Sequence, residues 1–126
     1  MKYIALLGRI LFAFIFVIAG AAHFTKADIG YAESAGVPMA SIIVPFSGLM
    51  AVVGGLSIAL GYKAKWGAWL IVLFLIPVTL TMHAFWKATD PQMIQNQQVH
   101  FFKNVAMLGA ALMITQFGSG PASLKD

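Results

Sequence analysis

Hydrophobic side chains fill four stretches of this 126-residue chain, and polar residues gather in the three segments between them. The apolar runs cover about residues 4–24, 41–60, 66–85 and 101–117. Each approaches the roughly 17–25 residues that a helix needs to cross the hydrocarbon core of a bilayer. A helix satisfies its own backbone hydrogen bonds, which lipid cannot do for it. The sequence therefore predicts an all-α membrane protein, a four-transmembrane-helix bundle that forms a single domain over residues 1–126.

The connections between the runs indicate which helices are neighbours. The middle connection, residues 61–65, is so short that the second and third helices must be antiparallel neighbours. The second run also carries a small residue at every fourth position, which places these residues on one helical face: Ser47, Ala51, Gly55 and Ala59. Small residues let two helices approach closely in lipid. We expect this face to pack against a helix of the same chain or to form a seam between copies.

The start of the chain has a second interpretation. Lys2, an apolar run and the small residues 19–22 together resemble a cleavable signal peptide. Arg9, however, interrupts the apolar run. The sequence therefore favours a retained first helix.

Composition supports the membrane assignment and excludes several kinds of chemistry. Hydrophobic residues make up 60% of the chain and charged residues 10%, whereas a soluble domain has about 25% charged residues. Cysteine is absent, which excludes disulfides, thiolate nucleophiles, iron–sulfur clusters and zinc–thiolate sites. Any redox role must therefore belong to a bound organic or haem-like cofactor.

Basic residues predict the orientation of the bundle. In the predicted topology one side collects Lys2, Arg9, Lys63, Lys65 and Lys125, and the other side collects Lys26, Lys87 and Lys103. The side richer in Lys and Arg is normally cytoplasmic. We therefore expect both termini in the cytoplasm. The net charge of +4 is scattered between apolar runs, so it does not indicate a nucleic-acid partner.

The same topology places most of the chemically interesting side chains at the non-cytoplasmic end. Ionisable and polar groups are costly at the edge of a membrane span, so we treat them as candidate ligand-binding residues. The candidates at this end are His23, His83, Trp86, His100, Lys103 and Asn104.

Three interpretations of these residues remain open. They can be independent interfacial anchors, or His83, Lys103 and Asn104 can hold the carbonyl oxygens of a quinone-like or lipid-like molecule. Metal or haem ligation is the third, but no HxxxH or HExxH spacing supports a metal site and haem is disfavoured. The pocket interpretation expects His83 and Trp86 on one side of a helix end, and Lys103 and Asn104 at a helix start with unpaired N–H groups.

Arg9 is the remaining candidate, about one and a half turns inside the first predicted helix. Its side chain can snorkel to the cytoplasmic headgroups, or it can face inward and pair with carbonyl groups or an acid. No acid lies in a predicted span, since the chain's acids are Asp28, Glu33, Asp90 and Asp126. This absence favours snorkelling, an anionic ligand or a partner subunit.

No familiar catalytic motif is present. The chain has no GxSxG elbow, no P-loop, no dinucleotide glycine fingerprint and no pair of carboxylates within the spans. Catalytic residues are therefore unknown, and a non-catalytic role is favoured over an enzyme. Four spans without repeated broken helices also argue against a stand-alone secondary transporter.

Several short segments in a fixed order resemble the DoxX family across nearly the whole chain. They are Arg9 before a run into Ala19 and Gly20, the pair Gly54 and Gly55, Gly61 before a basic turn, residues 83–86, residues 101–104, Gly109 and residues 120–126. Two positions depart from many relatives: Ala51 replaces a glutamate and His23 replaces a lysine. A carboxylate that would balance Arg9 in relatives is therefore missing.

The resemblance implies a multi-pass protein of the bacterial inner (cytoplasmic) membrane. Relatives include subunits of thiosulfate:quinone oxidoreductase and proteins linked to oxidative-stress complexes. We therefore expect an accessory membrane subunit with a quinone- or lipid-sized pocket near the outer face. Its expected partners are membrane lipids and either a redox protein or a second copy, and quinone is the candidate cofactor. The alternatives are a non-catalytic scaffold that recruits a partner protein and a small permease-like protein.

Overall fold

The computed structural model describes residues 2–121, 123 and 124, with the Lys2 side chain excepted. In that part of the chain all regular structure is helical, which confirms the predicted all-α class. The elements are α1 (Lys2–Ala22), α2 (Lys26–Ser34), α3 (Ala40–Leu60), α4 (Ala64–Met82), the 3-10 turn η1 (Phe85–Lys87) and α5 (Pro91–Phe117). Lys125 and Asp126, which enter the orientation and resemblance arguments, lie outside the described residues.

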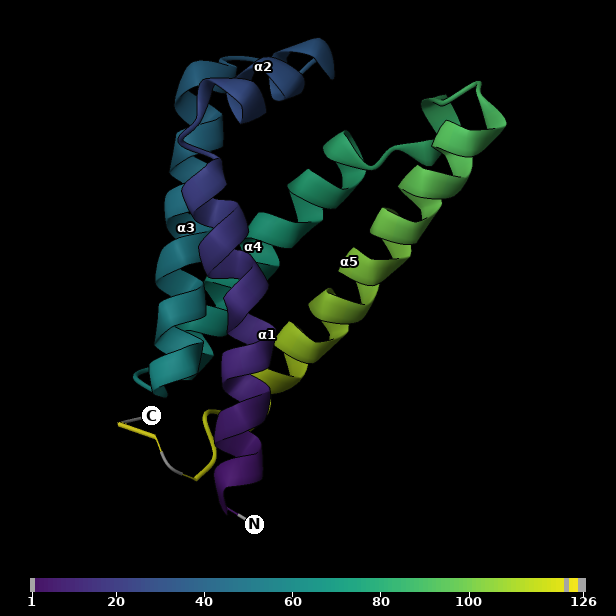
Figure 1. Cartoon of the computed structure of the whole chain (residues 1–126). Helices are drawn as coiled ribbons and strands as arrows, with labels where there is room; N and C mark the ends of the chain where they lie inside the picture. The colour runs from purple at the N-terminus through teal and green to yellow at the C-terminus, as the bar shows by residue number, and fades with distance from the viewer. Residues whose placement is uncertain (1, 122, 125–126) are drawn as a thin grey trace.

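The long helices form a row in which each packs against the next. α1 packs on α3, α3 on α4 and α4 on α5, while α2 packs on α3. No comparable packing joins α1 to α5 among the described residues, so the row is open on one side. Figure 1 shows both chain ends at the same end of the molecule and α2 lying across the other end. The predicted antiparallel pairing of the second and third long helices is confirmed.

Local sequence sets where the short helix and the tight turn occur. The Thr25 side chain caps α2 by accepting a hydrogen bond from the backbone N–H of Asp28 at 3.3 Å. α3 ends at Gly61, whose φ of 70° is a left-handed conformation that glycine adopts without steric cost. α5 begins at Pro91, which has the first-turn position that proline favours.

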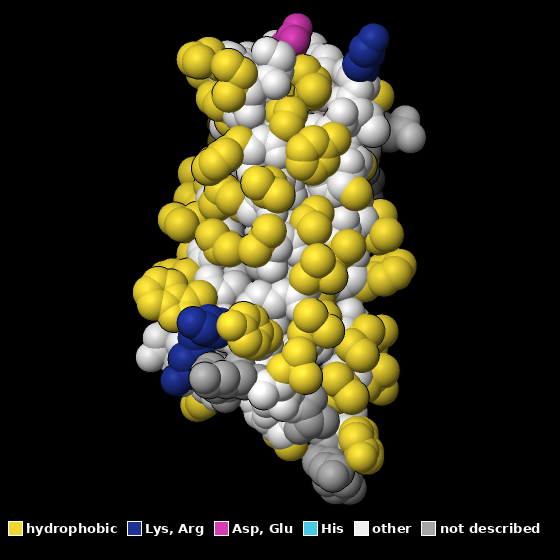
Figure 2. All heavy atoms as spheres, turned by 90° about the vertical axis from the view of Figure 1, so that its left-hand side faces the viewer, with side chains coloured by type: hydrophobic (Ala, Val, Ile, Leu, Met, Phe, Trp, Pro, Cys, Tyr) yellow, Lys and Arg dark blue, Asp and Glu magenta, His cyan; other side chains and the backbone are white. Residues whose placement is uncertain are grey.

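Three helices of the described chain are long and apolar enough to cross a membrane: Tyr3–Ala22, Ala40–Leu60 and Ala64–Lys87, the last of which continues through η1. Figure 2 shows the matching surface, with hydrophobic side chains over the middle of one face and Lys and Arg only near its top and in its lower part. α5 does not join these three spans, because Lys103, Asn104 and Gln116 interrupt its apolar half. The fourth span stays a prediction.

Three element boundaries differ from those expected. The polar stretch after the first run contains the helix α2, the third long helix ends at Met82 rather than near 85, and α5 begins at Pro91 rather than near 101. The apolar run marks only the part of a helix that lipid surrounds. The glutamine-rich segment before residue 101 has good helix propensity and continues α5 outward by almost three turns.

Glycines on α3 allow its neighbours to approach closely. A Cβ atom at Gly48 would lie 2.5 Å from the carbonyl oxygen of Gly20 on α1, and one at Gly55 would lie 3.1 Å from a methyl of Val17. On a different side of α3, a Cβ at Gly54 would lie 2.8 Å from the carbonyl oxygen of Gly67 on α4. The small residues at 51 and 55 are buried within the bundle. The predicted close packing is therefore confirmed as a contact inside the chain.

Candidate functional site

Four side chains from three elements meet at the end of the molecule opposite the termini, and we call them the histidine cluster: Tyr31 of α2, His83 after α4, and Gln97 and His100 of α5. Nδ1 of His83 lies 2.9 Å from Oε1 of Gln97. Nε2 of Gln97 donates to the hydroxyl of Tyr31 at 3.3 Å. The rings of His83 and His100 stack with centroids 5.0 Å apart and planes inclined by 19°. The cluster thereby ties α2, the end of α4 and the first half of α5 together.

The hydrogen bond to Gln97 sets the chemistry of His83. An amide oxygen only accepts hydrogen bonds, so Nδ1 of His83 carries the proton and Nε2 is an acceptor in the neutral ring. No other residue in the described ranges hydrogen-bonds to this Nε2. The ring is partly exposed, and Lys103 lies close enough for its charge to act on it. His83 can therefore receive a hydroxyl donor at Nε2.

Four aromatic rings at the same end of the molecule pack on one another, and we call them the aromatic wall: Phe85 and Trp86 of η1, and Phe101 and Phe102 of α5. Phe85 packs edge-on against Trp86 and against Phe101, both with centroids 5.3 Å apart. Trp86 and Phe101 lie 5.8 Å apart. Phe101 directly follows His100 in α5, and Phe85 follows His83 by two positions, so the wall and the cluster come from the same two segments of the chain. Polar groups next to a rigid aromatic surface are the usual composition of a small-molecule site.

Two geometric expectations for this site are wrong. His83 and Trp86 do not share one side of a helix end, because α4 ends at Met82 and Trp86 belongs to the 3-10 turn. Lys103 and Asn104 do not open a helix, because α5 begins at Pro91 and their backbone N–H groups lie in its interior. Lys103 is exposed, whereas Asn104 is 5% exposed and belongs to the buried face of α5.

His23 lies at the same end of the bundle but makes separate contacts. Its Nδ1 lies 2.6 Å from the carbonyl oxygen of Ala19 and 3.5 Å from a carboxylate oxygen of Asp28. Its ring packs against Phe74 with centroids 5.5 Å apart. These contacts join the end of α1 to α2. Within the described ranges, no group of three or more His, Cys, Asp or Glu side chains could hold a metal ion.

Arg9 is buried at the opposite end, with only 6% of its surface exposed. Nη1 donates to the carbonyl oxygens of Ser119 at 2.7 Å and of Pro121 at 2.8 Å. The segment after α5 turns back across the bundle, and the backbone N–H of Leu124 donates to the carbonyl oxygen of Leu60 at 3.2 Å. The inward interpretation, in which Arg9 pairs with carbonyl groups, is therefore confirmed. The snorkelling interpretation is wrong because the returning chain supplies oxygen acceptors inside the bundle.

Sequence reasoning missed Tyr31 and Gln97. Tyr31 lies in a segment that hydropathy marks only as polar, and Gln97 is one of four glutamines between positions 92 and 98. A signal for Gln97 exists once α5 is extended to Pro91, since positions 97, 100 and 104 then lie along one helical face. No comparable signal identifies Tyr31.

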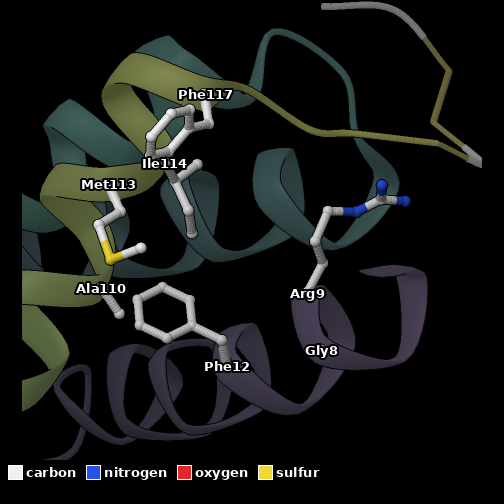
Figure 3. Close-up of a pocket in the computed structure, with 7 residues that line it drawn as sticks. All are labelled: Gly8, Arg9, Phe12, Ala110, Met113, Ile114 and Phe117. Carbon is white, nitrogen blue, oxygen red and sulfur yellow. The ribbon is translucent and has the colours of Figure 1, made fainter. Parts of the chain in front are cut away.

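A concave feature lies between α1 and α5, toward the end with the termini. This open cavity has a volume of about 330 Å³ and is lined by Gly8, Arg9, Phe12, Ala110, Met113, Ile114 and Phe117. Figure 3 shows the Arg9 guanidinium directed away from the rings of Phe12 and Phe117, so only its aliphatic part contributes to the lining. We call this cavity the α1–α5 groove. It does not lie at the end with the histidine cluster, where the sequence predicted a pocket.

Comparisons with known proteins place these features in context. The DoxX family model matches residues 4–84, from α1 through α4. The chain is 29% identical over 121 residues to the inner membrane protein YphA of Escherichia coli (strain K12), covering 94% of this chain and 86% of that protein. It is 24% identical over 81 residues to the ER-derived vesicles protein ERV29 of Saccharomyces cerevisiae, covering 64% of this chain and 26% of that protein. No solved structure matches the chain.

Proposed function

The chain belongs to the DoxX family, and we propose that it is an accessory subunit of a quinone-linked redox complex in the bacterial inner membrane. In this proposal it binds a quinone headgroup between the histidine cluster and the aromatic wall. The observation that carries the proposal is the hydrogen-bonded and stacked set of Tyr31, Gln97, His83 and His100 beside four aromatic rings. The inner-membrane location is supported by the name of the E. coli relative and by the three apolar helices.

The proposed site matches both forms of the ligand. Quinone oxygens accept hydrogen bonds, and the Lys103 ammonium is a donor. Hydroquinone hydroxyls donate, and Nε2 of a neutral His83 accepts. The rings of Phe85, Trp86 and Phe101 offer flat and edge surfaces to an aromatic headgroup. Transfer of electrons belongs to the redox partner in this proposal, because this chain has no cysteine or catalytic motif for that step.

The proposal includes a fourth span formed by residues 101–117 of α5, with both termini in the cytoplasm. It is supported by the position of both chain ends at one end of the bundle and by the surplus of basic residues there (Figure 1). Reporter fusions after Lys65 and after Asp126 are expected to report the cytoplasm, and fusions after Asp28 or Asp90 the opposite side. A periplasmic signal after Asp126 would show that α5 does not cross or that the orientation is reversed.

Quinone binding can be tested with Trp86 as the reporter. Trp66 and Trp69 lie near the start of α4, so replacing both with phenylalanine leaves Trp86 as the single tryptophan. A quinone with one isoprene unit, titrated into this protein in detergent, is expected to quench Trp86 fluorescence. The further double change His83→Ala with Lys103→Ala is expected to weaken binding about tenfold, equivalent to roughly 1.4 kcal/mol of lost hydrogen bonding.

The matched control removes two exposed lysines at the same end, Lys26→Ala with Lys87→Ala, and is expected to keep the parent affinity. Helical content measured by circular dichroism should be the same in all variants. If the His83 and Lys103 changes left the affinity for the quinone unchanged, these residues would be independent interfacial anchors and not quinone ligands. The same conclusion would follow if the single-tryptophan parent showed no quenching.

A further inference from the structure

Two buried polar side chains lie opposite each other in the interface between α4 and α5, and we call them the inner polar pair: Thr79 of α4 and Asn104 of α5. The register of the two antiparallel helices follows from the stacked rings of His83 and His100, whose centroids lie 5.0 Å apart. Thr79 precedes His83 by four residues, and Asn104 follows His100 by four. Each member of the pair therefore lies one helical turn deeper than the neighbouring histidine, on the same face.

The packing of the two helices places both side chains inside the protein. Thr79 is 7% exposed and Asn104 is 5% exposed. α5 packs on α4 and η1, and Figure 1 shows α4 and α5 side by side, so the buried face of α5 is the one that meets α4. On the following turns toward the termini this interface is apolar, with Leu75 and Ala111 in the hydrophobic core. Apolar packing therefore closes the inner side of the pair.

The hydrogen-bonding groups of the pair have no partner among the described residues. Neither the Thr79 hydroxyl nor the Asn104 amide forms a hydrogen bond within that part of the chain. The buried Thr115, by contrast, donates to the carbonyl oxygen of Leu112 at 2.6 Å. Thr79 belongs to the apolar stretch Ala64–Lys87, where lipid cannot supply a partner. Buried polar groups without a partner are strongly disfavoured, so another molecule must satisfy this pair.

Water has the hydrogen-bonding groups that the pair requires. A direct bond between the side chains would leave groups unused, because the amide has two N–H donors and a carbonyl oxygen and the hydroxyl has one donor. A buried water molecule typically makes about three hydrogen bonds, as donor and acceptor. The Thr79 hydroxyl and the Asn104 amide each keep a small surface that a water molecule can touch. The interface therefore has both the polarity and the room that a water site needs.

Polar side chains connect the pair to the end of the molecule with the histidine cluster. Gln97, His100 and Asn104 lie along one face of α5, about one turn apart. Gln97 belongs to the polar first part of α5 and donates to the hydroxyl of the exposed Tyr31. Water that enters at the cluster therefore meets a hydrogen-bonding group on each turn of α5 as far as Asn104.

From these observations we infer that water occupies the α4–α5 interface at the inner polar pair, in a recess that opens at the histidine cluster and is closed by Leu75 and Ala111. The site takes a small neutral molecule, because neither Thr79 nor Asn104 carries a charge and the next turn is apolar. The recess extends one helical turn, about 5.4 Å, beyond the histidines. It is a binding site rather than a channel, and it exists whether or not the protein binds a quinone.

Reaction of introduced cysteines with N-ethylmaleimide tests for this water, because the thiolate reacts and a thiol surrounded by hydrocarbon stays protonated. The chain has no cysteine of its own. Thr79→Cys and Asn104→Cys each place a thiol at the pair and keep the other polar side chain. Leu80→Cys and Val105→Cys are matched controls at exposed neighbouring positions of the same helices. In liposomes of phosphatidylethanolamine and phosphatidylglycerol, both thiols of the pair are expected to react at least about tenfold faster than both controls.

A further change tests whether the two residues share the water. Asn104→Leu in the Thr79→Cys protein removes the amide and is expected to slow the reaction at least about tenfold. Val105→Leu in the same protein alters an exposed neighbour and should leave the rate unchanged. Helical content measured by circular dichroism should be the same in all these variants, which shows that the bundle is intact.

Two results would overturn the inference. Thiols at the pair that react no faster than the lipid-facing controls would show that the interface is dry. A fast reaction of the Thr79→Cys thiol that persists after Asn104→Leu would show that solvent reaches this position by another route. Both rates are measured without quinone, so failure here is distinct from failure of headgroup binding, which the Trp86 titration tests.

Discussion

Gly48→Leu is expected to destroy the folded bundle. A Cβ atom at this position would lie 2.5 Å from the carbonyl oxygen of Gly20 and 2.6 Å from the Cβ of His23, so α1 and α3 would have to separate. Overpacking a core commonly costs about 1–3 kcal/mol, and here one of the obstructing atoms is backbone, which cannot change rotamer. Most of the α1 packing is against α3. We expect the variant to fail to express as a monodisperse protein in detergent.

Two further glycines provide a graded comparison. A Cβ atom at Gly55 would lie 3.1 Å from a methyl of Val17. Gly55→Leu is therefore expected to lower the thermal midpoint in detergent without abolishing folding. A Cβ atom at Gly109 would have no other atom within 4 Å. The thermal midpoint of Gly109→Leu is therefore expected to equal or exceed that of the parent, since glycine inside a helix costs about 1 kcal/mol relative to alanine. Heat resistance of Gly48→Leu equal to that of the parent would contradict the described contact between α1 and α3.

Arg9→Met is expected to release the C-terminal segment. The change removes the donor for the carbonyl oxygens of Ser119 and Pro121. A hydrogen bond to a charged group contributes about 1.5–3 kcal/mol, so the bound position of this segment loses a substantial part of its stabilisation. Methionine keeps much of the apolar volume of the arginine stem. The expected effect is therefore local opening of the segment while the helices remain packed.

Cysteine labelling measures this opening, because the chain has no cysteine of its own. Ser123→Cys places a thiol in the segment, where Ser123 lies against Gly61. Its reaction with a maleimide is expected to be at least about tenfold faster in the Arg9→Met background. This factor corresponds to a loss of roughly 1.4 kcal/mol from the free energy that holds the segment in its bound position. Lys65→Met, an exposed basic position at the same end, is the control and should not change the rate. Equal rates in all three proteins would show that Arg9 does not hold the segment.

Hydropathy predicted the three long apolar helices well and the fourth poorly, for one physical reason. The run 41–60 matches α3 to within one residue, and 4–24 is displaced from α1 by only two, because lipid-exposed residues fill those helices from end to end. α5 is different, since six of its first ten residues are polar and this segment precedes the apolar half. A scale that records transfer into lipid has no information about a helix that continues into water.

The sequence predicted at which end of the bundle the candidate site residues lie, but not which of them contact one another. The topology placed His83 and His100 at one end, and they stack. Gln97 and Tyr31 were missed because their positions depend on the rotation of α5 and on α2 folding across the end of the bundle. The partners of Arg9 could not be identified individually, since they are backbone carbonyl groups, which every residue has and no sequence pattern marks.

The pairing of Arg9 with the end of the chain constrains the order of biosynthesis. Arg9 and Ser119 are 110 positions apart, so α1 is made and inserted long before its acceptors leave the ribosome. Until then its guanidinium must remain hydrated or in contact with headgroups, because an uncompensated charge within a span is costly. A chain truncated before residue 119 keeps that charge without these acceptors, so its first helix is less stable within the bilayer than that of the finished protein.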